Sequence, residues 1–211
     1  MATKIKICGV TRSEDALTIA RVKADMMGFV FFRQSPRYCP PEDVREMVTA
    51  VRAEIANAPL FVGVFVNEPT TEIIRTVRQC GLDVAQLHAN ETNEDAQALR
   101  AAGIKVIKAF GIESAESVKH LADYDVDAYL CDTPDPVSWG GTGRQFDHTL
   151  LVEATRQRKI ILAGGLRPDN VAGAIHLARP WGVDVSSGVE QSPGIKAPEK
   201  INAFVEAVRS S

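Results

Sequence analysis

The sequence predicts an α/β protein that folds as a single (β/α)8 barrel, with a parallel eight-stranded barrel and outer helices, over one domain at 1–211. Short β-branched or apolar runs alternate with stretches of helical period along the whole chain. Strands that alternate with helices are parallel and are joined by right-handed crossovers. Eight such units in 211 residues favour the closed arrangement known as a TIM barrel over an open sheet.

Eight segments have the composition of buried strands, and a helix candidate follows each of them. The strand candidates are residues 4–8, 27–32, 60–66, 84–88, 105–110, 128–132, 159–165 and 182–188. Five of the helix candidates begin at a capping residue or a proline. These starts are Thr11 or Ser13, Pro40 with Pro41, Pro69, Pro168 to Asn170, and Pro198.

Composition excludes several classes of protein. The net charge of -3 and the interspersed acidic and basic residues provide no basic stripe, so we expect no nucleic-acid partner. The four cysteines form no CxxC pair and have no metal-ligand spacing with the four histidines, which indicates reduced thiols and no metal. No signal peptide or membrane-spanning run is present, so we expect a cytoplasmic protein without a membrane partner.

A barrel of this kind carries its chemistry at the carboxyl ends of its strands. Glycine allows close approach of a ligand, and the loops after strands seven and eight of this fold frequently bind phosphate. We therefore expect phosphate at Gly164, Gly165, Ser186, Ser187 and Gly188. The alternative is that these residues only make tight turns.

Cys8 and Asp132 end strands one and six, where a base and an acid could flank one substrate. Strand periodicity places Cys8 on the same face as Lys6, and Asp184 on the neighbouring strand eight is a candidate ion-pair partner for Lys6. By the same reasoning we expect Lys108 to point inward beside Asp132. Two alternatives remain open: Cys8 as a small buried apolar residue, and Asp132 as the counter-charge of Lys108.

Further candidates lie in the loops at the same end. Arg37 could clamp a carboxylate with two hydrogen bonds, or it could be a solvated surface residue. His88, at the end of strand four beside Gln86, is expected to support the site. The loop after Asp132 is longer than usual connections and contains a glycine cluster at 139–143, ending in Gly143. This cluster is expected to cover the site or to be a surface loop without function.

Segments along nearly the whole chain closely resemble phosphoribosylanthranilate isomerase. They are KICGVT (6–11), GFVF with SPRY (28–38), VGVFVN (62–67), QLH (86–88), GGTG followed by F (140–146), LAGGLRPDNV (162–171), GVDVSSGVE (182–190) and PGIK (193–196). Each motif alone is weak, and their number, order and spacing together are highly specific.

The resemblance implies an Amadori rearrangement of N-(5'-phosphoribosyl)anthranilate in tryptophan biosynthesis, without cofactor or metal. It implies Cys8 as general base, Asp132 as general acid, and Arg37 as partner of the anthranilate carboxylate. The glycine and serine loops would bind the phosphate. His88, Gly143 and Asp184 would line the substrate site.

Two departures from the family pattern stand out. Ala89 replaces the glycine expected after His88, and Asp135 follows close on Asp132, which leaves a second carboxylate near the acid position. Two other classes remain open: another phosphosugar barrel isomerase, epimerase or indole-forming synthase, and a non-catalytic phosphate-binding barrel. The protein is expected to bind a small phosphosugar–anthranilate substrate as a monomer or a homodimer.

Overall fold

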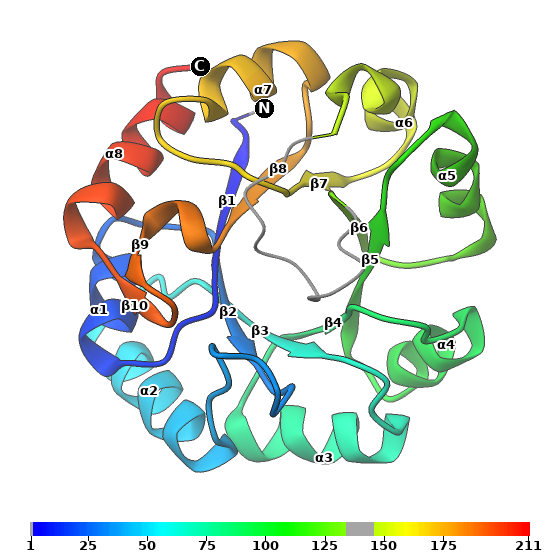
Figure 1. Cartoon of the computed structure of the whole chain (residues 1–211). Helices are drawn as coiled ribbons and strands as arrows, with labels where there is room; N and C mark the ends of the chain where they lie inside the picture. The colour runs from blue at the N-terminus through cyan, green and yellow to red at the C-terminus, as the bar shows by residue number, and fades with distance from the viewer. Residues whose placement is uncertain (1, 134–145) are drawn as a thin grey trace.

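The computed structural model describes residues 2–133 and 146–211. Eight parallel strands close into a barrel in chain order, and β8 pairs with β1 to complete it. Figure 1 looks along the barrel and shows the helices as a ring outside the strands. The (β/α)8 fold predicted from the alternation of segments is therefore confirmed.

Strands and helices alternate along the chain. The strands of the barrel are β1 (Lys4–Cys8), β2 (Met26–Val30), β3 (Leu60–Phe65), β4 (Val84–Leu87), β5 (Lys105–Gly111), β6 (Ala128–Asp132), β7 (Ile160–Leu162) and β8 (Gly182–Val185). The helices are α1 (Ser13–Arg21), α2 (Pro41–Glu54), α3 (Thr70–Cys80), α4 (Asn93–Ala101), α5 (Ala115–Lys119), α6 (Val152–Gln157), α7 (Val171–Ala178) and α8 (Pro198–Arg209). Short 3₁₀ turns are η1 (His120–Asp123), η2 (His148–Leu151) and η3 (Ser187–Val189).

Helix α2 shows why the sequence signals located the helices well. Pro41 occupies its first turn, where the missing N–H costs nothing, and Glu42 and Asp43 face the positive end of the helix dipole. Its buried residues recur at intervals of three and four, as an amphipathic helix against a sheet requires. They are Val44, Met47, Val48 and Val51.

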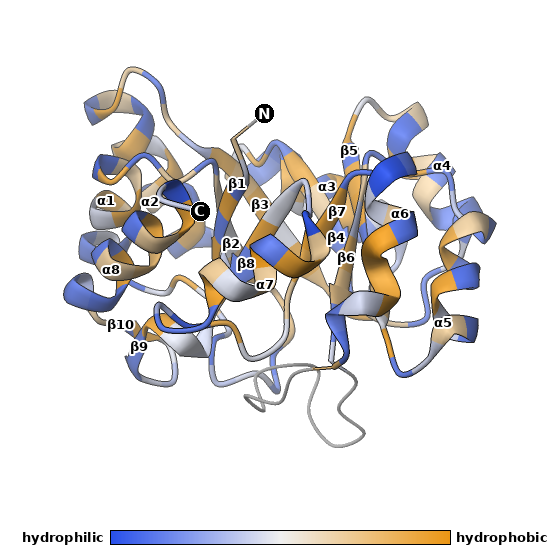
Figure 2. Cartoon of the chain, turned by 90° about the horizontal axis from the view of Figure 1, so that it is seen from above, coloured by the Kyte–Doolittle hydropathy of each residue, from blue (hydrophilic) through white to orange (hydrophobic). Residues whose placement is uncertain are grey.

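Strands β7 and β8 are shorter than predicted. Gly164 and Gly165 have φ angles of 90° and 62°, a left-handed backbone that ends β7 before them. After β8 the chain turns at Ser186 and enters η3, and it then forms an unpredicted antiparallel hairpin of β9 (Glu190–Ser192) and β10 (Ile195–Lys196). Figure 2 shows this hairpin beside the carboxyl end of the barrel.

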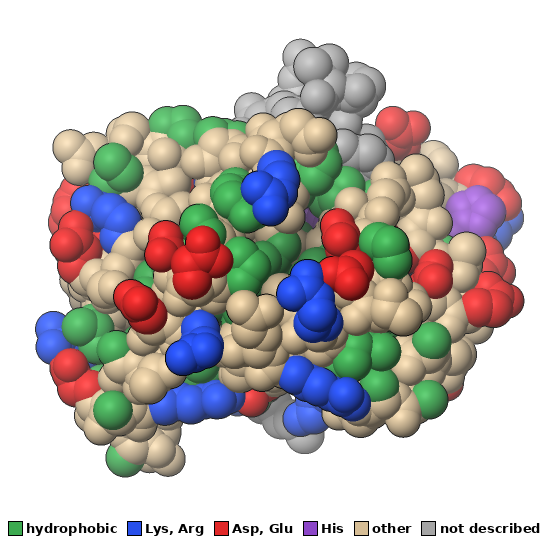
Figure 3. Space-filling view, turned by 90° about the horizontal axis from the view of Figure 1, so that it is seen from below, with side chains coloured by type: hydrophobic (Ala, Val, Ile, Leu, Met, Phe, Trp, Pro, Cys, Tyr) green, Lys and Arg blue, Asp and Glu red, His purple; other side chains and the backbone are tan. Residues whose placement is uncertain are grey.

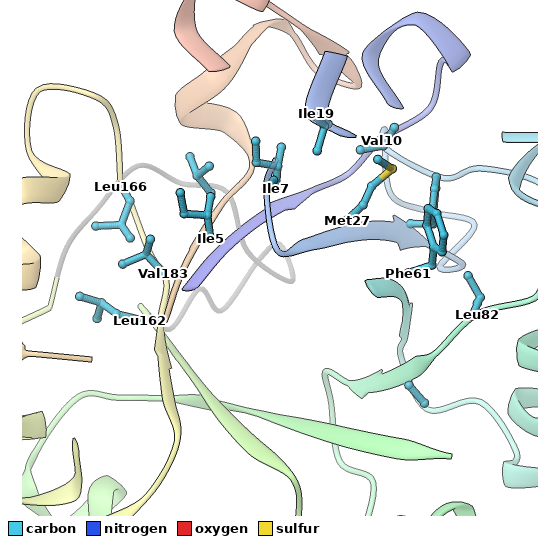
Figure 4. Packing of buried hydrophobic residues seen from close by; sticks show 14 of the residues in the cluster. Ile5, Ile7, Val10, Ile19, Met27, Phe61, Leu82, Leu162, Leu166 and Val183 are labelled. Carbon is cyan, nitrogen blue, oxygen red and sulfur yellow. The ribbon is translucent and has the colours of Figure 1, made fainter. Parts of the chain in front are cut away.

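Apolar side chains fill two separate layers. The inner layer lies inside the barrel and consists of Met26, Val62, Val84, Ile107, Ala128, Leu130, Ile161 and Ala163. The outer layer packs between the strands and the ring of helices, and Figure 4 shows part of it around Ile5, Ile7 and Val183. Alternation along each strand therefore decides which side chains can reach the mouth of the barrel.

Lys108 does not face the interior of the barrel, and the prediction that it lies inward beside Asp132 is wrong. Ile107 belongs to the inner layer and Val106 to the outer layer, so Lys108 points outward. Its ammonium donates to the carbonyl of Ala89 at 2.5 Å and pairs with Glu91 at 3.1 Å. The error arose because strand five carries lysines at 105 and 108, and only the apolar neighbours reveal which residues point inward.

Figure 3 shows both acidic and basic side chains on one face of the molecule, with several basic ones in the lower half of the view. Within residues 2–133 and 146–211, no helix combines the length and the apolar character needed to cross a bilayer.

Candidate active site

Cys8 closes β1 with its thiol at the mouth of the barrel. It pairs in register with Gly28, which faces the interior because Met26, two residues earlier, belongs to the inner apolar layer. A Cβ atom at position 28 would lie 2.7 Å from Cys8 Sγ. Glycine at this position therefore makes the space that the thiol occupies, and Cys8 is only 8% exposed.

Burial and nearby charges act on this thiol in opposite directions. Burial raises the pKa of Cys8 above its ordinary value, Lys6 and Lys196 lower it, and Asp184 raises it. The net direction is upward, so the resting group is a thiol. The attraction by Lys6 that the sequence suggested is present, but burial outweighs it.

Lys6 and Asp184 form the interior ion pair that the sequence predicted. The two residues are register partners on β1 and β8, and Lys6 Nζ lies 3.0 Å from Asp184 Oδ1. Burial would lower the pKa of Lys6, but the attraction of Asp184 and Cys8 outweighs it and the pKa is raised. Lys6 lies two residues before Cys8 on β1, and Asp184 neutralises part of its charge.

Asp132 ends β6 on the inward face that it shares with Leu130 of the inner layer. Its Oδ1 accepts a hydrogen bond from the backbone N–H of Thr133 at 2.7 Å. A Cβ atom at Gly164 would lie 2.9 Å from the same oxygen. The bare glycine after β7 is thus needed for the backbone to pass beside this carboxyl group.

The loops after β7 and β8 touch each other. A Cβ atom at Gly188 would collide with the carbonyl oxygen of Leu166, so this approach also requires glycine. The N–H groups that open η3, at Ser187 and Gly188, precede any intrahelical acceptor. The Ser186 hydroxyl is buried without a hydrogen-bond partner in the described structure. Donors for an oxyanion are therefore gathered here.

Arg37 is held by a residue that the sequence did not reveal as part of the site. Its Nε and Nη2 donate to the two carboxylate oxygens of Glu190 at 2.9 and 2.8 Å. The side chain is 15% exposed, so it is not the solvated surface arginine of the alternative interpretation. The hydrogen bonds to Glu190 raise the pKa of Arg37, which stays charged.

Lys196 is the second residue that sequence reasoning missed. Its buried ammonium donates to the backbone carbonyl of Cys8 at 2.5 Å, to that of Ser186 at 3.2 Å and to Glu190 at 2.9 Å. It lies on β10, which the sequence did not predict. The motifs ending in Glu190 and Lys196 were the only sequence signal, and they assigned neither residue a role.

His88 follows β4 and lies beside Gln86, whose Nε2 is 2.8 Å from the ring Nδ1. Burial and the positive charges of Lys6 and Lys108 lower the pKa of His88 to about 4. The ring is therefore neutral at physiological pH. With Gln86 donating to Nδ1, the ring proton is on Nε2, which is a hydrogen-bond donor.

Two residues considered from the sequence, Asp135 and Gly143, and the rest of the glycine cluster at 139–143, lie outside the described residues. Among the described residues, no three His, Cys, Asp or Glu side chains are grouped as metal ligands would be. A hollow of about 590 Å³ lies at the amino-terminal end of the barrel, lined by residues such as Arg21, Glu54 and Leu60. None of the candidate site residues lines it, so we place the chemistry at the carboxyl end.

Comparisons with known proteins point to one family. The family model for N-(5'phosphoribosyl)anthranilate (PRA) isomerase matches residues 5–207. An N-(5'-phosphoribosyl)anthranilate isomerase of Citrifermentans bemidjiense is 47% identical over 96% of this chain and 95% of its own. The crystal structure of the Thermotoga maritima phosphoribosyl anthranilate isomerase superposes with a TM-score of 0.89 at 38% identity, covering 99% of this chain and 100% of the other.

A further structure of this kind contains a ligand. It is a phosphoribosyl anthranilate isomerase in complex with reduced 1-(o-carboxyphenylamino)-1-deoxyribulose 5-phosphate, with a TM-score of 0.86 at 37% identity. The match covers 99% of this chain and 100% of that one.

Proposed function

The chain belongs to the N-(5'-phosphoribosyl)anthranilate isomerase family and is an isomerase of tryptophan biosynthesis, and we propose that Cys8 and Asp132 carry the proton transfers of its reaction. One observation supports this assignment above the others. Strands β7 and β8 lie between β6, which ends in Asp132, and β1, which ends in Cys8. A phosphate bound by the loops after β7 and β8 would thus lie between the acid and the base.

The reaction is an aldose-to-ketose rearrangement within one molecule. Asp132 donates a proton to the ribose ring oxygen as the bond from that oxygen to C1' breaks, and the anthranilate nitrogen supplies the electron pair that makes the protonated Schiff base. Cys8, as thiolate, removes the proton from C2', and the electrons move to the nitrogen to give the enolamine. The enolamine then tautomerises to the ketone, 1-(2-carboxyphenylamino)-1-deoxyribulose 5-phosphate. Each positioned proton transfer contributes about 10²–10⁴-fold.

Anchors at the two ends of the substrate hold it for these transfers. We assign the phosphate to Gly164, Gly165, Ser186, Ser187 and Gly188, where backbone donors meet a buried hydroxyl. The anthranilate carboxylate is assigned to the charged, partly exposed guanidinium of Arg37.

Three residues complete the proposed substrate site. His88 contributes a neutral donor at the mouth, and Asp184 contributes a carboxylate that is 10% exposed. Gly143 is proposed as a substrate-site residue from the family motif alone. Binding at these anchors orients the sugar for the proton transfers.

Steady-state turnover of N-(5'-phosphoribosyl)anthranilate, followed by the change in anthranilate fluorescence, tests the catalytic roles. We expect Cys8→Ser and Asp132→Asn to lower kcat by about 10²–10⁴-fold, because each removes one proton transfer, with KM changing much less. Thermal unfolding checks that both variants are folded. Wild-type-like turnover in either variant would remove that residue from its role.

The setting of the protein is part of the proposal. All four cysteines are free thiols, which supports a reducing, cytoplasmic compartment. We propose a small-molecule substrate and no nucleic-acid partner, with the protein acting as a monomer or a homodimer. Sedimentation at micromolar concentration distinguishes these two states.

A further inference from the structure

One carboxylate links two parts of the site that lie far apart in the sequence. Glu190, at the start of β9, is 4% exposed at its side chain and binds Arg37 on one side and Lys196 on the other. We propose that Glu190 is a positioning residue that orients Arg37 toward the substrate carboxylate and ties this orientation to the ends of β1 and β8. The proposal rests on the proposed function, in which Arg37 recognises the anthranilate carboxylate.

The hydrogen bonds to Arg37 determine which edge of the guanidinium is left for the substrate. A guanidinium carries five N–H donors, and Glu190 takes the edge formed by Nε and Nη2. The end-on edge, formed by Nη1 and the second N–H of Nη2, is not used by Glu190. A carboxylate approaching along that edge meets two parallel donors, the geometry that gives bidentate recognition.

The backbone at Gly9 packs against the Arg37 side chain and restricts its direction. Gly9 directly follows Cys8 and has a φ of 75°. A Cβ atom there would lie 2.6 Å from Cδ of Arg37 and 3.0 Å from Oγ of Ser186. The arginine therefore lies across the turn that follows the proposed base, and its direction is coupled to that turn.

Lys196 anchors the other side of the carboxylate. It donates to Glu190 Oε1 at 2.9 Å and also to the carbonyls of Cys8 and Ser186, which end β1 and follow β8. The backbone N–H of Gly194 adds a contact of 3.3 Å to the same carboxylate oxygen. Glu190 is thus held from both sides, and it does not simply occupy the place of a substrate carboxylate until the substrate arrives.

The charge state of Glu190 supports this arrangement. Burial would raise its pKa, but the hydrogen bonds and charges of Arg37 and Lys196 outweigh burial and bring the pKa below its ordinary value. The group is therefore a carboxylate that accepts from two cations.

The test compares two ligands of wild type and Glu190→Gln. One is reduced 1-(o-carboxyphenylamino)-1-deoxyribulose 5-phosphate, and the other is its phenylamino counterpart, which lacks only the ring carboxylate. We expect Glu190→Gln to weaken the first by about tenfold, since a charge-assisted pair is misaligned, and the second by less than about twofold. Titration calorimetry measures both.

Glu91→Gln is the matched control, because Glu91 is also a buried carboxylate, 3% exposed, that pairs with a lysine. In that variant both ligands should bind as they do to the wild type, or weaken by the same factor. If Glu190→Gln does not fold, Glu190→Asp keeps the charge but is too short to reach Arg37 and Lys196 together, and it should show the same selective loss.

Equal weakening of both ligands by the Glu190 variants would overturn the positioning role, because it would mean only a general loss of structure. Failure of the proposed function appears separately, as absence of wild-type turnover of N-(5'-phosphoribosyl)anthranilate. In that case the calorimetric comparison still reports whether Glu190 acts on carboxylate recognition.

Discussion

Two buried glutamate–lysine pairs lie on opposite sides of the carboxyl end of the barrel, Glu190–Lys196 after β8 and Glu91–Lys108 beside β4 and β5. Their geometry is nearly the same. The ammonium-to-carboxylate distances are 2.9 and 3.1 Å, and all four side chains are at most 4% exposed.

The two pairs differ in what else they hold. Glu91 accepts the backbone N–H groups of Asn67 and Ala89, each at 2.8 Å, and so ties together the loops after β3 and β4. It also supports Asn67 at a left-handed φ of 52°. Glu190 instead holds a side chain at the mouth of the barrel. Equal burial and equal pairing therefore do not indicate equal roles, and the further partners of each carboxylate decide.

Removal of each lysine tests this difference with the largest expected effect. Lys108→Met leaves the buried carboxylate of Glu91 without its cation, which costs about 3–5 kcal/mol of folding free energy. Lys196→Met leaves Glu190 paired with Arg37 alone and should cost less. Chemical denaturation measures this loss. At a temperature where both variants are folded, their kcat/KM values should differ. Lys196→Met should lose at least about tenfold in kcat/KM because Arg37, Cys8 and Ser186 lose a common anchor.

Lys108→Met should keep kcat/KM within about twofold of the wild type, since its partners are loop backbone and Glu91. A loss of activity as large as that of Lys196→Met would mean that both pairs are structural supports of the same kind.

Sequence patterns predicted the residues at the strand ends better than the residues that hold them in place. The strand ends at Cys8 and Asp132 and the Lys6–Asp184 pair follow from strand periodicity and from the closure of β8 on β1. These inferences need only local alternation and one rule of topology. The sequence therefore predicted the fold and the positions of the groups that end the strands.

The supports depend on contacts that no local pattern contains. Arg37 and Glu190 are 153 positions apart, and the hairpin that carries Lys196 has strands of three and two residues, too short for a periodicity signal. The prediction for Lys108 was wrong for a related reason. Lys105 and Lys108 lie on opposite faces of the strand, and the sequence does not show which face points inward. Only the packing of Ile107 with its neighbours in the barrel decides between them.

The pH dependence of turnover tests the charges that act on Cys8. Burial places the pKa of Cys8 above its ordinary 9.0, while Lys6 and Lys196 from the site side act to lower it. Because the reacting form is the thiolate, kcat/KM should rise with pH, by about tenfold per unit below that pKa. In Lys6→Met the rise should move to higher pH, and in Lys108→Met it should stay where it is. A plateau reached by pH 7 would contradict a raised pKa in the free enzyme.

Charges from Lys6 and from the Glu91–Lys108 pair act on His88, and the expected effects there are small. Its pKa is lowered to about 4 by burial first, then by Lys6 on the site side and by Lys108 on the other, with Glu91 opposing them. An NMR titration of the imidazole carbons should therefore give a midpoint near pH 4 in the wild type. Lys6→Met should raise this midpoint more than Lys108→Met, since Lys6 contributes the larger charge effect.

The same shift has a consequence for folding stability. The unfolded chain binds a proton at this histidine near pH 6.5, above the folded value, so the unfolded state holds more protons between about pH 4 and 6.5. Stability should therefore fall as pH falls through this window, and His88→Gln should remove that part of the loss. A midpoint near 6.5 in the wild type would show that the ring is hydrated and that neither Lys6 nor Lys108 acts on its pKa.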